Sequence, residues 1–311
     1  MNEHDITITR RTAISLAAMA SATLLPALPA WAQAATPISR RIPSSGELLP
    51  VVGIGTAIIF DFENDKAKLD ERAEVIKALV AGGGKLIDTA PSYGKAEDRL
   101  GELFAMTGLR DKIFLATKVR VADRDETIAE MKSSFAKMRV SKVDLMQLHN
   151  VRDANQTLSL LREWKSQGLC KYIGITSSFD RDYAAVESTL KREKPDFFQI
   201  DYSMVDRNSE ERLIPAAADA GCAILTNLPF GRGKFFQKTA RKPLPDWAVK
   251  ELGVTSWAQY GLKWLLGNQA INAVIPGTDK PQYMVDNLKA GIGNMPDAAM
   301  RKRMAEHFEA L

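Results

Sequence analysis

Short apolar runs alternate with longer amphipathic stretches along the chain from residue 49 onward. Most of the runs are almost continuously apolar, as in parallel strands that are buried on both faces. The stretches between them carry apolar residues at helical spacing, as in LDERAEVIKALVAGG, where they recur mostly at i, i+3 and i+4. The pattern predicts eight strands, at 49–56, 85–90, 113–119, 144–150, 172–178, 197–203, 223–229 and 273–278.

Eight strands that are each followed by a helix, in about 260 residues, predict an α/β fold of the (β/α)8 TIM-barrel type. The rival fold, an open doubly wound sheet, favours a G-x-G-x-x-G loop after its first strand, and GIGTAI lacks the third glycine. We expect a single barrel domain over residues 47–311. A linker at 33–46 precedes it, and the stretch SRRIPSSGELLP can form a short hairpin over the barrel floor. The long gap before the last strand has room for a loop and a helix.

The first 32 residues have the pattern of a targeting segment. Arg10 and Arg11 precede an apolar run that contains two prolines and ends in an A-x-A cleavage pattern. The prolines disfavour a transmembrane helix, whereas a signal peptide accommodates them. TRRTAIS resembles a twin-arginine export signal, although Ala13 stands where a Phe is usual, and a general secretory signal is the alternative. We therefore expect a signal peptide at 1–32 that engages the export machinery, no stable membrane anchor and a periplasmic protein.

Composition adds mainly exclusions. Lys+Arg 42 against Asp+Glu 38 gives a net charge of +4, which is too balanced to indicate a nucleic-acid partner. Two cysteines exclude a disulfide scaffold and a multi-cysteine metal site, so no metal is expected. Cys170 and Cys222 lie near the starts of two strands that are not neighbours. Alternate strands are roughly 10 Å apart, which is too far for a disulfide, so we expect both cysteines to be buried free thiols. We expect the protein to be a monomer.

Polar residues gather at the ends of several predicted strands, where TIM-barrel enzymes place their catalytic groups. Asp88 ends the second strand and Tyr93 follows it, Lys118 lies on the third strand and His149 on the fourth. Of the other histidines, His4 lies in the signal segment and His307 in the C-terminal tail, which leaves His149 alone in the barrel.

These four residue types suit proton donation to a carbonyl that becomes an alkoxide. A tyrosine hydroxyl is normally a weak acid, and a neighbouring ammonium favours the phenolate. Lys118 can supply that ammonium, Asp88 can hold Lys118, and His149 can orient the carbonyl. None of the four is a hydride source, so a nicotinamide cofactor has to provide the hydride. A structural salt bridge between Asp88 and Lys118, or a lyase with a Schiff base on Lys118, are alternatives.

The stretches GIGT, LIDTAPSYGKAEDRLGELF, IFLATKV, DLMQLHN, FFQIDYS and VIPGTDKPQYMVDNLKA resemble the aldo-keto reductase family, in order and over roughly residues 47–290. The resemblance implies a catalytic tetrad at Asp88, Tyr93, Lys118 and His149. It also implies reduction of aldehyde or ketone carbonyls with NAD(P)H, with Tyr93 as the general acid.

The resemblance also suggests cofactor contacts. Gln199 matches a glutamine that contacts the nicotinamide amide, and Thr176 and Ser177 stand where a Ser-Asn pair is usual. Asn227 replaces a stacking tyrosine. Gly277 and Tyr283 stand where many members have Lys and Arg for the 2′-phosphate, which argues against NADP. Lys280, Arg232 or Lys234 can supply the missing charge, so NADP is expected and NAD stays open. The full set of expected contacts is Gly55, Thr56, Thr176, Ser177, Gln199, Asn227, Pro229, Gly231, Arg232, Gly277, Thr278, Lys280 and Asn287.

The expected function is therefore NAD(P)H-dependent carbonyl reduction on a small-molecule substrate. A slow or non-catalytic NADP(H)-binding module that senses redox state is the alternative, because a periplasm has no obvious nicotinamide supply. Substrate specificity would lie in loops around 57–66, 120–125 and 230–250. Their apolar residues, Phe60, Phe62, Phe230, Phe235 and Trp247, hint at an apolar pocket or serve the core.

Overall fold

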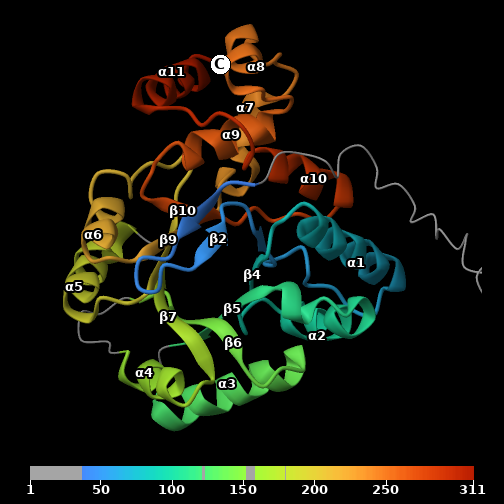
Figure 1. The fold of residues 1–311 in the computed structure, drawn as a ribbon, viewed down its shortest axis with the longest axis vertical. Helices are drawn as coiled ribbons and strands as arrows, with labels where there is room; N and C mark the ends of the chain where they lie inside the picture. The colour runs from blue at the N-terminus through green and yellow to red at the C-terminus, as the bar shows by residue number, and fades with distance from the viewer. Residues whose placement is uncertain (1–36, 121–122, 152–157, 179) are drawn as a thin grey trace, which may run out of the picture. The chain divides into compact units, whose positions relative to one another are not determined.

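Eight parallel strands form a sheet whose two edges meet (Figure 1). The computed structural model describes residues 37–120, 123–151, 158–178 and 180–311, so the predicted signal peptide and the first residues of the predicted linker lie outside it. The sheet order is β10-β9-β8-β7-β6-β5-β4-β3, and parallel bridges from Val52 to Val274 and from Gly55 to Gly277 join β3 to β10. The predicted (β/α)8 barrel is thereby confirmed. The strands are β3 (Ile54–Gly55), β4 (Leu86–Asp88), β5 (Phe114–Arg120), β6 (Val143–His149), β7 (Cys170–Ser177), β8 (Phe197–Asp201), β9 (Ala223–Asn227) and β10 (Ile271–Val274).

Helices surround the ring of strands (Figure 1). Aspartate caps start several of them: Asp65 accepts a hydrogen bond from Lys68 N at 3.1 Å ahead of α1, and Asp123 accepts one from Glu126 N at 2.9 Å ahead of α3. The α-helices are α1 (Lys66–Ala81), α2 (Ala96–Thr107), α3 (Arg124–Met138), α4 (Ser159–Ser166), α5 (Tyr183–Glu193), α6 (Leu213–Asp219), α7 (Lys234–Thr239), α8 (Asp246–Leu252), α9 (Trp257–Leu266), α10 (Pro281–Lys289) and α11 (Ala298–Glu309).

Alternation along each strand divides the core into two clusters. Successive strand residues point to opposite faces, so every second residue faces the barrel interior. The outward positions pack under the helices in one large cluster. The inward positions form a smaller cluster made of Leu86, Phe114, Ala116, Leu145, Tyr172, Phe197, Ala223, Leu225, Ala273 and Ile275, together with Ile42 and Leu49.

A hairpin closes the floor of the barrel. β1 (Ser39–Arg41) pairs antiparallel with β2 (Leu48–Pro50), and Ile42 and Leu49 of this segment belong to the inward cluster. The Arg40 guanidinium donates to the carbonyls of Leu266, Asn268 and Ile271. The hairpin is thus part of the barrel core.

Several element boundaries differ from the sequence prediction. The predicted first strand, 49–56, joins two elements: Leu49 and Pro50 lie in β2, and the barrel strand is only β3. Leu49 pairs with Arg40, and apolar periodicity cannot distinguish a hairpin strand from a barrel strand. β10 begins at Ile271 rather than at 273, and three helices, α7 to α9, fill the gap predicted to hold a loop and one helix.

The two cysteines are buried free thiols, as expected. Cys170 is the first residue of β7, and Cys222 directly precedes β9; β8 lies between these strands in the sheet. Burial raises the pKa of both thiols to about 12, so neither forms a reactive thiolate near neutral pH.

Candidate functional site

The inward-facing positions change from apolar to polar toward the carboxyl ends of the strands. Below this level the interior is filled by residues such as Leu86, Ala116 and Leu145. Two residues farther along the same faces come Asp88 on β4, Lys118 on β5 and Gln147 on β6. The period of two therefore gathers the polar side chains at one end of the barrel, where TIM-barrel active sites lie.

Asp88 and Lys118 form a fully buried ion pair at this end. Their side chains are 2% and 1% exposed, and Lys118 Nζ lies 2.7 Å from Asp88 Oδ2. The ammonium also donates to Thr89 O at 2.8 Å. Burial lowers the pKa of Lys118, but the charge of Asp88, the proximity of Tyr93 and hydrogen bonds with both outweigh it, so the pKa is raised. Lys118 is a fixed positive charge.

Two glutamine side chains complete the shell of Asp88. Gln147 Nε2 donates to Asp88 Oδ1 at 3.3 Å and to Gln199 Oε1 at 3.0 Å, and Gln199 Nε2 donates to Asp88 Oδ2 at 3.3 Å. Gln147 was missing from the predicted site. Its signal was present in DLMQLHN, where it is a polar residue two positions before His149 in an apolar strand.

Tyr93 lies between the lysine and the histidine. Lys118 Nζ is 4.9 Å from the centroid of the Tyr93 ring, and the rings of Tyr93 and His149 are 5.9 Å apart in an edge-to-face arrangement. Ser92, another residue that the sequence prediction lacked, places Oγ 3.4 Å from His149 Nδ1. The structure thus brings together the four predicted catalytic residues.

His149 is partly buried and is held in its neutral form. Burial lowers its pKa to about 4, and the positive charge of Lys118 acts in the same direction. Near neutral pH the imidazole is therefore uncharged and can make a hydrogen bond without adding a second cation beside Lys118. Such a group can orient a carbonyl through a hydrogen bond, but it is a poor general acid at this pH.

Unpaired buried oxygens lie at the ends of β7 and β9. Ser177 Oγ and Asn227 Oδ1 are buried without a hydrogen-bond partner, and Asn227 Nδ2 donates to Ser178 Oγ over a long distance, 3.4 Å. By strand alternation, Asn227 lies on the inward side of β9 and Ser177 on the outward side of β7. Thr176 Oγ1, by contrast, accepts from Asn150 N at 2.9 Å. Free hydrogen-bonding atoms in a buried setting fit a ligand with an amide, such as a nicotinamide.

The loop after β9 turns sharply through three residues with positive φ. Gly231, Arg232 and Gly233 have φ values of 52°, 54° and 87°, and a Cβ at Gly231 would overlap the side chain of Val205. The amides of both glycines already donate to backbone carbonyls of the same loop, so the exposed Arg232 side chain, rather than a row of free amides, offers positive charge to an anion. Pro229 is buried at the start of the same loop.

The remaining predicted cofactor contacts lie on β3 and after β10. Thr56 donates to Asp88 O from both N and Oγ1, at 3.0 Å each, and Gly55 is bridged to Gly277. Thr278 and Asn287 are buried and joined by a 3.0 Å hydrogen bond. Lys280 directly precedes α10. A Cβ at Gly277 would lie 3.8 Å from the Ile59 side chain, an ordinary packing distance, so a methyl group would fit at this turn.

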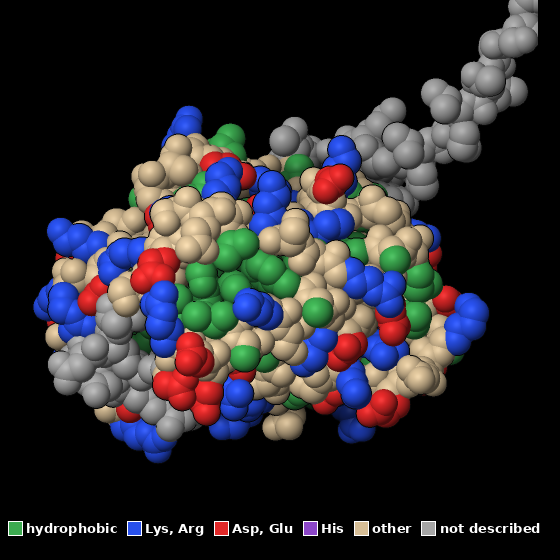
Figure 2. All heavy atoms as spheres, turned by 90° about the horizontal axis from the view of Figure 1, so that it is seen from below, with side chains coloured by type: hydrophobic (Ala, Val, Ile, Leu, Met, Phe, Trp, Pro, Cys, Tyr) green, Lys and Arg blue, Asp and Glu red, His purple; other side chains and the backbone are tan. Residues whose placement is uncertain are grey.

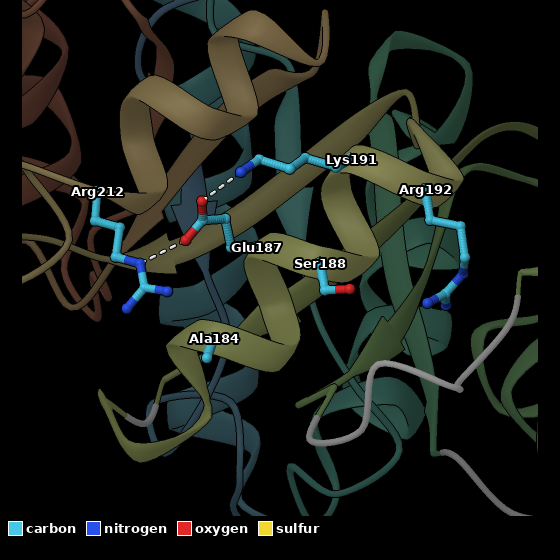
Figure 3. Close-up of a pocket in the computed structure, with 6 residues that line it drawn as sticks. All are labelled: Ala184, Glu187, Ser188, Lys191, Arg192 and Arg212. Carbon is cyan, nitrogen blue, oxygen red and sulfur yellow. Dashed lines mark hydrogen bonds and ion pairs between the residues drawn. The ribbon is translucent and has the colours of Figure 1, made fainter.

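Two surface hollows are lined by none of the four predicted catalytic residues. One, of about 710 Å³, is lined by Pro91, Ser92, Arg120 and α3. Another, of about 570 Å³, lies on α5 and ahead of α6, where Glu187 bridges Lys191 and Arg212 (Figure 3). None of the predicted site residues lines the second hollow, which belongs to the outer wall.

The apolar loop residues are mostly core residues. Phe60, Phe62 and Phe235 are buried, and Phe230 and Trp247 pack against the large cluster. Of the two uses that the sequence allowed for these side chains, core packing holds for the three buried ones.

The described residues contain no group of three or more His, Cys, Asp or Glu arranged to hold a metal. Among the same residues, no helix has both the length and the apolar character needed to cross a bilayer.

On the face shown in Figure 2, positive and negative side chains are interspersed around a central apolar patch. That face therefore carries no large area of one sign.

Comparison with known proteins identifies the family. Residues 51–305 match the model of the aldo/keto reductase family. The chain is 27% identical over 281 residues to aldo-keto reductase str7 of Strobilurus tenacellus, covering 77% of this chain and 82% of that protein. It is 28% identical over 288 residues to the NADP-dependent D-sorbitol-6-phosphate dehydrogenase of Malus domestica, covering 79% and 86%.

Solved structures show the same fold. The aldo-keto reductase of Klebsiella pneumoniae in complex with NADPH aligns with a TM-score of 0.73 at 18% identity, over 88% of this chain and 96% of that one. The thermostable aldo-keto reductase Tm1743, in complex with the inhibitor epalrestat, aligns with a TM-score of 0.70 at 26% identity, over 86% and 99%. The chain therefore belongs to the aldo/keto reductase family of NADP(H)-dependent carbonyl oxidoreductases.

Proposed function

We propose that the protein reduces an aldehyde or ketone with NADPH and that Tyr93 donates the proton to the carbonyl oxygen. The observation that carries this proposal is the position of Tyr93, whose ring is 4.9 Å from the ammonium of Lys118 and 5.9 Å from the ring of His149. A hydroxyl between a fixed cation and a neutral imidazole can donate to an oxygen on which negative charge develops.

Each member of the tetrad then has one task. Asp88 and the two glutamines hold the Lys118 ammonium at the barrel end, and this ammonium stabilises the phenolate that remains after Tyr93 has given up its proton. The neutral His149 imidazole donates a hydrogen bond to the substrate carbonyl and orients it toward Tyr93. When bound, NADP(H) supplies the hydride.

The cofactor residues fit a dinucleotide. Gln199 and Asn227, on the inward sides of β8 and β9, would face the nicotinamide amide, and the exposed Arg232 would supply charge for the pyrophosphate. Lys280 would supply charge for the 2′-phosphate at the start of α10. The similarity to the NADP-dependent dehydrogenase of Malus domestica supports NADP over NAD.

The geometry argues against a Schiff-base lyase. The Lys118 ammonium is paired with Asp88, donates to Thr89 O and has a raised pKa. A Schiff-base lysine needs a neutral amine, which a lowered pKa provides. Lys118 has the opposite setting.

We also propose that residues 1–32 are a twin-arginine signal peptide and that the mature protein is a periplasmic monomer. The Arg10-Arg11 pair ahead of an apolar run and an A-x-A pattern supports this proposal. A reporter that is fused to residues 1–36 should stay in the cytoplasm when both arginines are changed to lysine. Continued export of that reporter would refute a twin-arginine route.

The central experiment combines nucleotide identification with a Tyr93→Phe variant. Mass analysis of the purified protein should find NADP(H), and Tyr93→Phe should bind it normally but reduce aldehydes about 10²–10⁴-fold more slowly. Normal turnover by Tyr93→Phe would show that the proton comes from another group. Tight NADP(H) binding with negligible turnover by the unmodified protein would favour the redox-sensing module.

A further inference from the structure

The loop between β3 and α1 is attached at both ends to the tetrad region. At its start, Thr56 N and Oγ1 both donate to the backbone oxygen of the tetrad residue Asp88, at 3.0 Å each. At its far end, the carboxylate of Asp61 accepts a hydrogen bond from Lys95 N, with Oδ1 2.9 Å from the nitrogen. Lys95 is two residues after Tyr93. Residues 56–61 thus form an arc from Asp88 to the segment that carries the proposed proton donor.

A strained turn shortens this arc. Ile59 N donates to Ala57 O at 2.8 Å, with Ile58 between them at a φ of 68°. A three-residue turn with positive φ is the rare, strained form, and a β-branched residue tolerates it poorly. The Ile58 side chain is 80% exposed, so its burial offers nothing to offset the strain. The hydrogen bonds on either side of the turn must hold it.

A second contact fixes the middle of the arc. Arg72 of α1 is 6% exposed, and its Nε donates to Ile59 O at 2.9 Å. Its Nη1 donates to the carbonyl of Asp279, directly before Lys280 and α10. The arc is therefore held against the barrel wall and does not depend on Asp61 for its own position.

Gly94 is shaped to receive the Asp61 carboxylate. Its φ is 57°, and a Cβ at this position would overlap the carboxyl group of Asp61. The carboxylate can therefore reach Lys95 N only because residue 94 has no side chain. Lys95 is the N-cap residue of α2 and makes no side-chain capping bond of its own, so Asp61 ties down this end of the helix from another loop.

Tyr93 is connected to the same backbone. Its N donates to Ala90 O at 3.1 Å, and its O accepts from Ala96 N at 3.0 Å. Tyr93, Gly94 and Lys95 thus form one turn between β4 and α2, and a shift of Lys95 moves the Tyr93 backbone with it. Its ring must stay near Lys118 and His149 for proton transfer.

We propose that Asp61 is a positioning residue that fixes Tyr93 for proton transfer through Gly94 and Lys95. This inference rests on the proposed function of Tyr93. Asp61 acts through the hydrogen bond that it accepts, so an amide oxygen at the same place can replace its carboxylate. Because a displacement of about 1 Å in a catalytic group can lower a rate by about 10²-fold, loss of this bond should change kcat more than KM.

The first test compares Asp61→Ala, Asp61→Asn and a matched control, Glu63→Ala, which removes an exposed carboxylate from the same loop. With NADPH and a simple aldehyde, Asp61→Ala should lower kcat by about tenfold or more, within the ~10²-fold range for misplaced groups. The Kd for NADPH should change by less than about twofold, because the hydrogen bonds of Thr56 and Arg72 hold the rest of the arc in place without Asp61. Asp61→Asn should restore most of kcat, and Glu63→Ala should match the unmodified protein.

A cycle with Gly94→Ala tests the contact itself. Gly94→Ala alone should lower kcat, because its methyl group displaces the Asp61 carboxylate. When Asp61 is already alanine, the same change should have a smaller further effect on kcat. Independent effects of the two substitutions would overturn the proposed contact.

A spectroscopic readout separates this inference from the proposed function. In protein labelled with 3-fluorotyrosine, the Tyr93 resonance is identified by its loss in Tyr93→Phe. It should shift or broaden in Asp61→Ala and return to its original position in Asp61→Asn. An unchanged resonance would overturn the positioning role of Asp61, whether or not the protein reduces a carbonyl. A shifted resonance in a protein that reduces no carbonyl would support the role and refute the proposed function instead.

Discussion

Replacing Lys118 with methionine isolates the buried ion pair of the tetrad. In the folded protein Asp88 is 2% exposed, and its carboxylate accepts from Lys118 at 2.7 Å and from the amides of Gln147 and Gln199 at 3.3 Å. Lys118→Met leaves this charge buried with only the two longer, neutral bonds. Breaking one side of a buried pair costs about 3–5 kcal/mol, and because two amides remain bonded to Asp88 we expect a loss of about 3 kcal/mol.

Urea titration, with tryptophan fluorescence as the signal, measures this loss in the free energy of unfolding. In a thermal scan, about 3 kcal/mol corresponds for a domain of this size to a fall in melting temperature of about 6–12 °C. Adding Asp88→Asn to Lys118→Met removes the unpaired charge and should recover a large part of the loss. The control is Lys66→Met, which breaks a surface pair whose side chains are 84% and 50% exposed and should cost less than about 1 kcal/mol.

Two results would refute this reasoning. If Lys118→Met destabilised the protein no more than Lys66→Met does, the buried carboxylate would not depend on the ammonium. If the double variant were less stable than Lys118→Met, the cost would come from lost packing rather than from an unpaired charge.

The other two predictions concern pH and backbone strain. The pKa of His149 is about 4 in the folded protein and near its ordinary 6.5 when unfolded, so unfolding takes up a proton between these values. The free energy of unfolding should therefore decrease as the pH falls from 7 to 5, with about 2 kcal/mol of that decrease due to His149. Urea titrations at the two pH values should show a smaller decrease for His149→Gln. An equal decrease in both proteins would contradict the lowered pKa. Ile58→Asn places a residue that tolerates positive φ in the strained turn and loses little burial, because Ile58 is 80% exposed. It should raise the free energy of unfolding by about 1 kcal/mol, and a lower melting temperature by calorimetry would show that the turn is not strained.

Strand alternation explains why the barrel and the tetrad were predictable from sequence. Asp88, Lys118 and His149 each interrupt an apolar run near its carboxyl end, and parallel strands bring those ends together. The same reasoning covers Gln147, which also interrupts an apolar run and was nevertheless missed. Gln147 lies on β6 and bonds Asp88 on β4, on the far side of β5. The sequence does not show which side chains reach across an intervening strand.

The loops were less predictable because their contacts join distant parts of the chain. Asp61 contacts Lys95, and Arg72 contacts Asp279, and neither contact leaves a periodic trace in the sequence. The sequence could not decide between pocket and core for Phe60 and Phe62, because aromatic composition is the same for both, and the structure buries both side chains. The first strand was misassigned because β2 and β3 are both apolar and only three residues apart.

The floor hairpin can complete its contacts only after the C-terminal part of the chain has been synthesised. Arg40 and Arg41 are held by residues about 230 positions later, through Leu266, Asn268, Ile271 and Asn272, and Ile38 N donates to Gly291 O. During synthesis these partners are made last, so β1 and β2 cannot complete their contacts until α9 and β10 have been synthesised. Contacts of such sequence separation form slowly. A chain that ends before residue 257 would lack every one of these partners and would leave the floor of its barrel open.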